Sequence, residues 1–213
     1  MPTMTPRQAG QLFKRLREAN PEPKTELEYK DAYTLLVAVI LSAQATDVGV
    51  NKATRKLFLV ADTPEKMVAL GEAGLTEHIK TIGLFRNKAK AVIAMSQKLL
   101  AEHGGRVPAS REALEKLPGV GRKTANVVLN SAFGRPTIAV DTHVFRVANR
   151  TGLARGQTPL EIEQQLEAVV PRAYRHHAHH WLILHGRYVC LARKPRCPEC
   201  VIRDLCQYGA KTV

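Results

Sequence analysis

The sequence predicts an all-helical (all-α) protein, and three observations support this fold class. Helix start signals recur along the chain, because Thr5-Pro6-Arg7-Gln8 and Thr158-Pro159-Leu160-Glu161 both have the form of a capping box with proline at the first helical position. Apolar residues follow these signals at helical spacing. Alternation of apolar and polar residues, which indicates a half-buried strand, hardly occurs. We therefore expect helices joined by short turns.

The expected helices follow one another from the N-terminus. The first carries an apolar stripe that includes Phe13, and Asn20-Pro21-Glu22-Pro23 forms a turn or connector after it. Residues 33–41 are almost entirely apolar, which predicts a buried helix. Thr63-Pro64 and Ser110 are further helix starts. Gly104-Gly105 ends the helix that carries Leu99 and Leu100.

The stretch 117–129 predicts a helix, a tight hairpin and a second helix. Gly119 and Gly121 permit unusual backbone angles and close approach of another molecule. With the unpaired N–H groups of the next helix's first turn, they can bind a phosphate, although an ordinary helix-helix turn has the same form. Ala125, Val128, Leu129 and Ala132 form the expected buried stripe of that helix. The spacing then places Lys123 on the open face, beside Arg122, where it can reach a ligand.

Composition indicates the class of partner. The 213 residues carry 32 Lys and Arg against 19 Asp and Glu, a formal charge of +13, which favours a polyanion. The chain is long enough for one compact body or a bilobed one. No signal peptide or membrane-spanning run is found, so we expect an intracellular protein without membrane contact. In that reducing setting, clustered cysteines indicate a metal site rather than disulfides.

The four cysteines have the spacing Cys190-x6-Cys197-x2-Cys200-x5-Cys206. Zinc sites usually pair two short Cys-x2-Cys knuckles, and only one is present, so the spacing allows zinc without favouring it. Four thiolates with one short and two longer gaps can also hold a [4Fe-4S] cluster.

Two further groups of residues allow a structural and a functional interpretation. Asp141 follows Ile138-Ala139-Val140 and precedes a helical pattern, so its residue type predicts a helix N-cap. The histidines at 176, 177, 179 and 180 allow a metal hypothesis, but no carboxylate lies nearby in the sequence. We favour a partly exposed helix, with Trp181, Leu182 and Leu184 in the core.

Four segments together resemble the endonuclease III family of DNA glycosylases, in its lysine-bearing, bifunctional branch. They are Leu-Pro-Gly-Val-Gly-Arg-Lys-Thr-Ala (117–125), Leu-Ser-Ala-Gln-Ala-Thr-Asp (41–47), Ala-Val-Asp-Thr-His-Val-Phe-Arg-Val (139–147) and the cysteine cluster. The resemblance implies a two-lobed helix-hairpin-helix DNA glycosylase fold with a C-terminal iron-sulfur cluster loop. Residues 25–135 would form a six-helix barrel with the helix-hairpin-helix at about 111–132. Residues 1–24 and 136–213 would form the second domain, with the [4Fe-4S] loop at 190–206 and a cleft between the lobes.

The resemblance also implies the chemistry. A damaged base leaves the duplex stack, Lys123 attacks C1′ of the sugar to form a Schiff base, and Asp141 moves a proton or stabilises positive charge. The residue matching Gln44 fills the gap left by the flipped base, Ser42 lies near the pocket, and Leu84 resembles a wedge on the opposite strand. The four cysteines match the cluster ligands. The remaining expected DNA contacts are Gly119, Val120, Gly121, Arg122, Thr124, His143, Arg187, Arg193, Lys194 and Arg196.

We therefore expect a monomeric, cytoplasmic, nucleoid-associated enzyme that acts on double-stranded DNA containing a damaged base or an abasic site. Oxidised pyrimidines would be the excised bases, and β-elimination would cleave 3′ to the abasic site. A monofunctional mismatch glycosylase is one alternative, but that branch generally lacks a lysine at the position of Lys123. A non-catalytic DNA-binding protein is another, against which Lys123 and Asp141 together argue.

Overall fold

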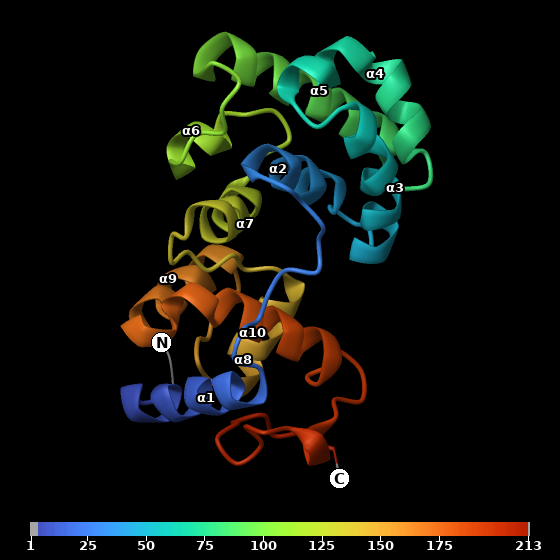
Figure 1. The fold of residues 1–213 in the computed structure, drawn as a ribbon. Helices are drawn as coiled ribbons and strands as arrows, with labels where there is room; N and C mark the ends of the chain where they lie inside the picture. Colours follow the sequence, from blue (N-terminus) through green and yellow to red (C-terminus); the bar gives the residue numbers. More distant parts are fainter. Residues whose placement is uncertain (1–3, 213) are drawn as a thin grey trace. The chain divides into compact units, whose positions relative to one another are not determined.

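The computed structural model describes residues 4–212, and every regular element within them is a helix, which confirms the predicted all-helical class (Figure 1). The chain divides into two compact units, residues 1–24 with 135–213 and residues 25–134. Residues 1–3 and 213, which belong to the expected second domain, lie outside the described residues. No helix within residues 4–212 is long and apolar enough to cross a membrane.

The unit of residues 25–134 contains six helices in chain order. They are α2 (Ala32–Leu41), α3 (Asp47–Val60), α4 (Pro64–Ile79), α5 (Phe85–His103), α6 (Arg111–Glu115) and α7 (Arg122–Phe133). The apolar α2 is buried along its length, as predicted, and it contacts α3, α5 and α7 (Figure 1). A helix that is apolar on all sides is stable in water only when other helices surround it. The unit is therefore built around α2.

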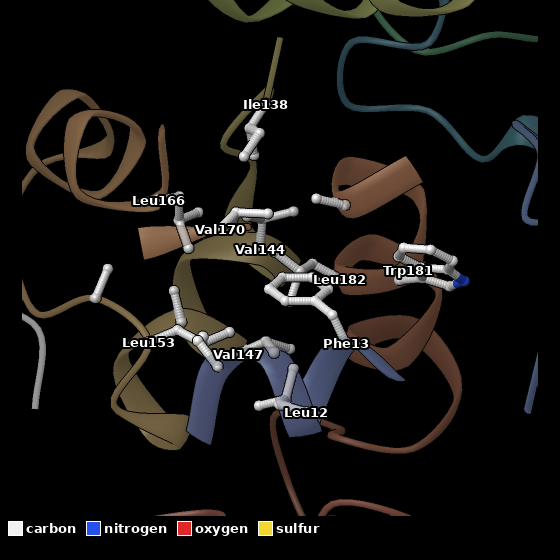
Figure 2. Close-up of a cluster of buried hydrophobic side chains, with 14 of the residues drawn as sticks. Leu12, Phe13, Ile138, Val144, Val147, Leu153, Leu166, Val170, Trp181 and Leu182 are labelled. Atoms are coloured by element: carbon white, nitrogen blue, oxygen red, sulfur yellow. The ribbon is translucent and has the colours of Figure 1, made fainter. Parts of the chain in front are cut away.

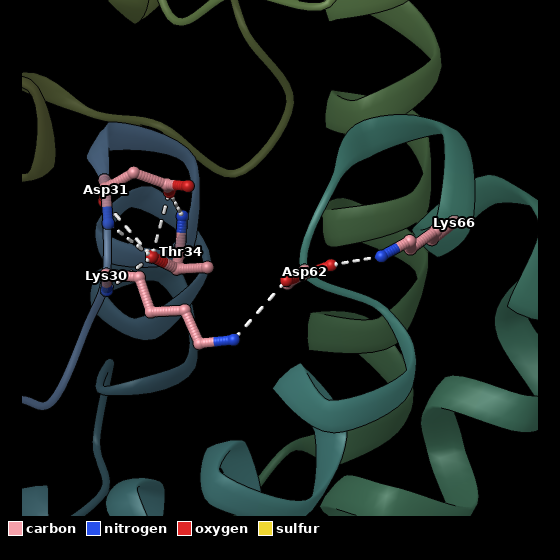
Figure 3. A network of polar contacts seen from close by, with 5 residues as sticks. All are labelled: Lys30, Asp31, Thr34, Asp62 and Lys66. Carbon is pink, nitrogen blue, oxygen red and sulfur yellow. Dashed lines mark hydrogen bonds and ion pairs between the residues drawn. The ribbon is translucent and has the colours of Figure 1, made fainter.

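Polar contacts fix the start of α2 (Figure 3). Asp31 and Thr34 form a capping box, in which Asp31 Oδ1 accepts the Thr34 N–H at 2.8 Å. Asp62 accepts hydrogen bonds from Lys66 at 2.8 Å and from Lys30 at 3.3 Å. These two lysines hold the pKa of Asp62 below its ordinary value. The network ties the segment before α2 to the segment before α4.

The described part of the other unit, residues 4–24 and 135–212, contains four α-helices and two short 3-10 helices. They are α1 (Pro6–Ala19), α8 (Thr142–Thr151), α9 (Pro159–Val169), η1 (Arg172–Tyr174), α10 (Arg175–Tyr188) and η2 (Cys197–Glu199). Their apolar faces meet in one core, where Phe13 of α1, Val147 of α8 and Leu182 of α10 are fully buried (Figure 2). Leu166 of α9 joins the same core. The Trp181 indole N–H donates to the Asn20 carbonyl at 2.7 Å, which fixes the end of α1.

Most predicted helix starts are confirmed. Both Thr-Pro capping boxes are formed, and Thr63 and Ser110 cap their helices through side-chain oxygens. The helix before the hairpin is shorter than predicted, because it ends at Glu115 and Leu117 lies in the following turn. Leu117 is nevertheless 2% exposed, so it remains in the core without being helical.

Candidate functional site

The hairpin between α6 and α7 has a geometry that only glycine allows at position 119. Gly119 has φ +76°, and an added Cβ would lie 2.9 Å from Ala91 Cβ and 3.5 Å from Ile40 Cγ2. Gly121 differs, because its φ is −98° and an added Cβ would meet nothing within 4 Å. The expected need for unusual angles thus applies to Gly119 alone. Gly121 instead leaves open space outside the hairpin.

The first turn of α7 presents donors to that open space. Gly121 is the N-cap and offers no side chain to accept from the backbone amides, and the first turn contains no acidic residue. Lys123 is exposed there, as the helical spacing predicted. Uncapped amides and the positive end of the helix dipole favour an anion at this position.

Val120 lies in the hairpin with its side chain turned into the core. Its side chain is 6% exposed, and its N–H donates to the Leu117 carbonyl at 3.1 Å. Val120 therefore anchors the hairpin to the core, and its expected contact with DNA stays a prediction.

Two neighbouring loops of the same unit hold residues in strained backbone conformations. Gln44 has φ 53° and Leu84 has φ 60°, a region that residues with a Cβ rarely occupy. An added Cβ on Gly83 would lie 3.7 Å from the Gln44 carbonyl oxygen, so the two loops are adjacent. Leu84 is 55% exposed, and Gln44 is exposed as well. Ser42 is the C-cap of α2, two residues before Gln44, and its hydroxyl donates to the Val39 carbonyl at 2.9 Å.

Asp141 caps α8, as its residue type predicted. Its Oδ1 accepts the N–H groups of His143 at 2.9 Å and Val144 at 2.8 Å. Both bonds end on the same oxygen, so Oδ2 keeps its lone pairs for a second role. The buried residues Ile138, Ala139 and Val140 hold the preceding segment, and His179 Nδ1 bonds the Ala139 carbonyl at 2.9 Å. The carboxylate is therefore held rigidly from both sides.

Two arginines of α8 bind carbonyls of α10 and of the cysteine loop. Arg146 donates to the carbonyl oxygens of Gly186 at 2.7 Å and Cys190 at 2.9 Å, and its Nη2 lies 3.2 Å from His143 Nδ1. One turn later, Arg150 donates to the carbonyls of Leu191 at 2.6 Å and Ala192 at 2.9 Å. The helix capped by Asp141 is thus fastened to the loop that begins at Cys190.

The four cysteines line one cavity, and none forms a disulfide. Burial raises the pKa of the Cys200 and Cys206 thiols, so thiolates there require positive charge, which iron supplies. Arg150 Nη1 lies 3.5 Å from Cys190 Sγ, and His185 Nε2 lies 3.6 Å from Cys200 Sγ. Four soft sulfur donors around a cavity, with a cation beside one of them, fit an iron-sulfur cluster.

Basic residues lie on the cysteine loop and at the end of α10, and Arg196 lines the cavity. Arg193, Lys194 and Arg196 are exposed, and Arg196 lies 4.0 Å from Glu199. Lys194 has φ 48°, so it is a further residue other than glycine in the left-handed region. Arg187 is half-buried at the end of α10. A loop held by a metal cluster would present these charges in a fixed shape, which suits phosphate binding.

The histidines of α10 lie on both sides of a partly exposed helix, as predicted. His179 is 3% exposed and His180 is 7% exposed, whereas His176 is exposed. Burial and the neighbouring histidines lower the pKa of His180 to about 3, so its imidazole is neutral. Within residues 4–212, no three His, Cys, Asp or Glu side chains are placed to hold a single metal ion.

The comparisons with known proteins agree with these features. The sequence model of the HhH-GPD superfamily of base excision DNA repair proteins matches residues 37–172. The model of the iron-sulfur binding domain of endonuclease III matches residues 190–206. Endonuclease III of Haemophilus influenzae is 60% identical over 201 residues, which cover 94% of this chain and 95% of the relative. The chain belongs to the endonuclease III family.

Other members and solved structures extend this result. Endonuclease III of Escherichia coli K12 is 59% identical over 94% of this chain and 95% of the relative. A trapped endonuclease III-DNA covalent intermediate is 42% identical, with a TM-score of 0.91 over 97% of this chain and 98% of that one. A thermostable thymine-DNA glycosylase is 25% identical, with a TM-score of 0.84, and the match covers 95% of this chain and 96% of that one. As a member of the endonuclease III family, this chain has a [4Fe-4S] cluster as its cofactor, in residues 190–206.

Sequence reasoning missed three residues near these sites. Arg146 and Arg150 were part of a helical pattern, and only their spacing of four residues, on one face of α8, could have drawn attention to them. Lys88 is 5% exposed on the buried face of α5. A lysine among apolar residues at helical spacing was a signal available in the sequence.

Proposed function

We propose that this protein is a bifunctional DNA glycosylase and abasic-site lyase of base excision repair, which removes oxidised pyrimidines with Lys123 as nucleophile. The observation that carries the proposal is the exposed Lys123 in the uncapped first turn of α7, in a chain about 60% identical to named endonuclease III proteins. The glycine hairpin before it lets a DNA backbone approach closely.

The reaction requires a nucleophile and a proton carrier. The Lys123 amine forms a bond to C1′ as the bond between C1′ and the base breaks, and the base leaves with its electron pair and gains a proton. Ring opening of the sugar gives a Schiff base to Lys123. Loss of a C2′ proton then expels the 3′ phosphate, and hydrolysis returns the amine. The product is a nicked strand with an unsaturated aldehyde at its 3′ end.

Asp141 serves the same sugar as the proton carrier in this proposal. Its Oδ1 is occupied by the two N–H groups of α8, so Oδ2 accepts the proton of the attacking amine or faces the positive charge on the opening sugar. A carboxylate that also caps a helix does not need to reorganise during the reaction. This rigidity supports the assignment of Asp141 rather than a surface acid.

The remaining residues bind and distort the duplex. Gln44 and Leu84, on adjacent strained loops, enter the base stack, with Ser42 beside the pocket. Gly119, Val120, Gly121, Arg122 and Thr124 bind phosphate around α7. In the other unit, His143 and Arg187 contact DNA together with the basic loop that carries Arg193, Lys194 and Arg196. The [4Fe-4S] cluster, with Cys190, Cys197, Cys200 and Cys206 as ligands, shapes that loop and transfers no electrons.

We assign the six-helix domain and the second domain to the two compact units, residues 25–134 and the remainder. The protein works as a monomer on chromosomal DNA in the cytoplasm, in association with the nucleoid. The formal charge of +13 supports binding of undamaged duplex through phosphates, and this binding should weaken steeply with added salt.

Borohydride trapping tests the proposal. The holoprotein is incubated with a duplex that contains one thymine glycol, borohydride is added, and a protein-DNA adduct is sought on a denaturing gel. Wild type and the control Lys116→Gln, an exposed lysine before the hairpin, should form the adduct, and Lys123→Gln should not. Base release without an adduct would instead indicate a monofunctional glycosylase. Neither product, on this duplex or on an abasic duplex, would overturn the proposal.

A further inference from the structure

Lys88 is an unpaired cation inside the helical unit. The residue is 5% exposed, and its Nζ is buried without a hydrogen-bond partner within the described residues. Burial lowers the pKa of its amine. A buried ammonium without a partner destabilises a folded protein, so its presence requires an explanation. The apolar face of α5 could have carried a leucine or methionine at this position without that cost.

Contacts between α2 and α5 place Lys88 near the loops of Gln44 and Leu84, to which the proposed function assigns DNA contacts. The Tyr33 hydroxyl and Ser96 Oγ lie 2.7 Å apart, near the start of α2. Gly119 packs against Ile40 and Ala91, nearer the end of α2. The two helices therefore run in opposite directions, and successive contacts lead along α5 toward its N-terminus.

The next contact in this direction lies beyond Lys88. Gly83 packs against the Gln44 carbonyl, just before the start of α5. Lys88 therefore lies between two fixed points, the hairpin at Gly119 and the adjoining loops of Gln44 and Leu84. Both points belong to the surface to which the proposed function assigns DNA contacts.

The start of α5 is itself suited to an anion. Its N-cap is Leu84, which provides no side-chain hydrogen bond, and its first turn contains no acidic residue. The first backbone amides of a helix with 19 residues therefore lack a capping acceptor. In a helix a side chain leans back toward the N-terminus, so Lys88 leans toward this turn.

We propose that Lys88 and the uncapped first turn of α5 form a second phosphate-binding site, which takes one backbone phosphate of the duplex when the loops of Gln44 and Leu84 engage DNA. The flexible stem of lysine lets its ammonium turn outward to the phosphate oxygen. The buried charge then gains the partner that residues 4–212 do not provide. This inference rests on the proposed function for its DNA partner, and it adds a contact that the hairpin does not supply.

The test measures the salt dependence of binding by the holoprotein to a duplex with a tetrahydrofuran abasic analogue. Each phosphate contact contributes about 0.9 to the slope of log K against log salt. Lys88→Met should reduce that slope by about 0.9, and Lys88→Arg should restore it. Lys66→Met removes the same charge from a side chain that is paired with Asp62, and it should keep the wild-type slope.

The unfolding temperature of the free protein provides a second readout. If Lys88 only stabilised the fold, its replacement would lower this temperature. Without DNA, Lys88→Met should unfold at a temperature equal to or higher than wild type, because it removes an unpaired buried charge. An unchanged salt slope, or a lower unfolding temperature with a wild-type slope, would overturn the proposal. If Lys88→Met does not fold, Lys88→Gln carries the same test.

Failure of this inference can be distinguished from failure of the proposed function. Borohydride trapping by wild type together with an unchanged slope for Lys88→Met would remove only the second phosphate site. A reduced slope in a protein that does not trap would leave a DNA-binding site and remove the lyase chemistry.

Discussion

Replacement of the two hairpin glycines by alanine should separate folding from DNA binding. In Gly119→Ala the new methyl group would lie 2.9 Å from Ala91 Cβ, in a backbone conformation with φ +76°. The left-handed conformation costs about 1–2 kcal/mol for a residue with a Cβ, and overpacking a tight contact costs about 1–3 kcal/mol. The side chain of Ala91 is a single methyl group that cannot move aside, so the close contact is not relieved. The cost of this contact therefore adds to the cost of the left-handed backbone. The expected loss of stability is about 2–5 kcal/mol.

Gly121→Ala is the matched variant. Its methyl group meets nothing within 4 Å and its φ of −98° is ordinary, so the loss is limited to about 1 kcal/mol from the changed N-cap. The same methyl group points into the space that the proposed phosphate needs. DNA affinity should therefore fall in Gly121→Ala although the protein remains folded.

Thermal unfolding followed by circular dichroism measures the difference. For a chain of this size, 1 kcal/mol corresponds to roughly 2–4 °C, so Gly119→Ala should unfold about 4–20 °C below wild type. Gly121→Ala should unfold within about 4 °C of it. DNA binding is measured on the same samples below both transitions. A Gly119→Ala protein as stable as wild type would refute the packing argument, and a Gly121→Ala protein with wild-type affinity would refute the close approach of phosphate.

Three other substitutions test the remaining parts of the structure. Asp141→Asn keeps a side chain that caps helices, so α8 should remain folded while single-turnover base release slows by about 10²–10⁴-fold; full activity would remove Asp141 from the chemistry. Arg150→Met loses the hydrogen bonds to the carbonyls of Leu191 and Ala192, so the visible absorbance of its cluster should bleach faster in air than that of Arg150→Lys. Equal bleaching rates would show that these hydrogen bonds do not stabilise the cluster loop. The pKa of His180 is lowered to about 3 in the folded protein, so below about pH 6.5 the unfolded chain binds a proton that the folded protein does not bind. The free energy of unfolding therefore decreases as the pH is lowered, by up to about 1.4 kcal/mol per pH unit. His180→Gln should flatten this decline between pH 6 and pH 5 in urea unfolding, and parallel curves for the two proteins would disprove it.

The local features of the fold could be predicted because they depend on neighbouring residues. The capping box at Thr5, the cap at Asp141 and the buried helix at 33–41 each follow from residue types at fixed spacing. The exposed position of Lys123 followed from the same periodicity. Such features need no knowledge of which helices pack together.

The features that were missed depend on packing between distant segments. The sequence did not show which of the two hairpin glycines is required, because the close contacts of Gly119 are with Ile40 and Ala91, which lie far away in the sequence. Burial of His180 is likewise decided by the helices around α10, so its polar residue type was misleading. The catalytic role of Asp141 came from the family resemblance rather than from periodicity, because no local pattern distinguishes a catalytic carboxylate from a capping one.

The arginine contacts of α8 also bear on how the iron-sulfur cofactor is held. Arg146 and Arg150 hold the carbonyls of Cys190, Leu191 and Ala192 through bonds that involve no iron. Ordering a segment of backbone costs about 1–2 kcal/mol per residue. The hydrogen bonds of these contacts offset part of that cost for the residues around Cys190, and iron contributes nothing to this part. The position of the first cluster ligand along the chain is therefore set by α8 as well as by the cofactor.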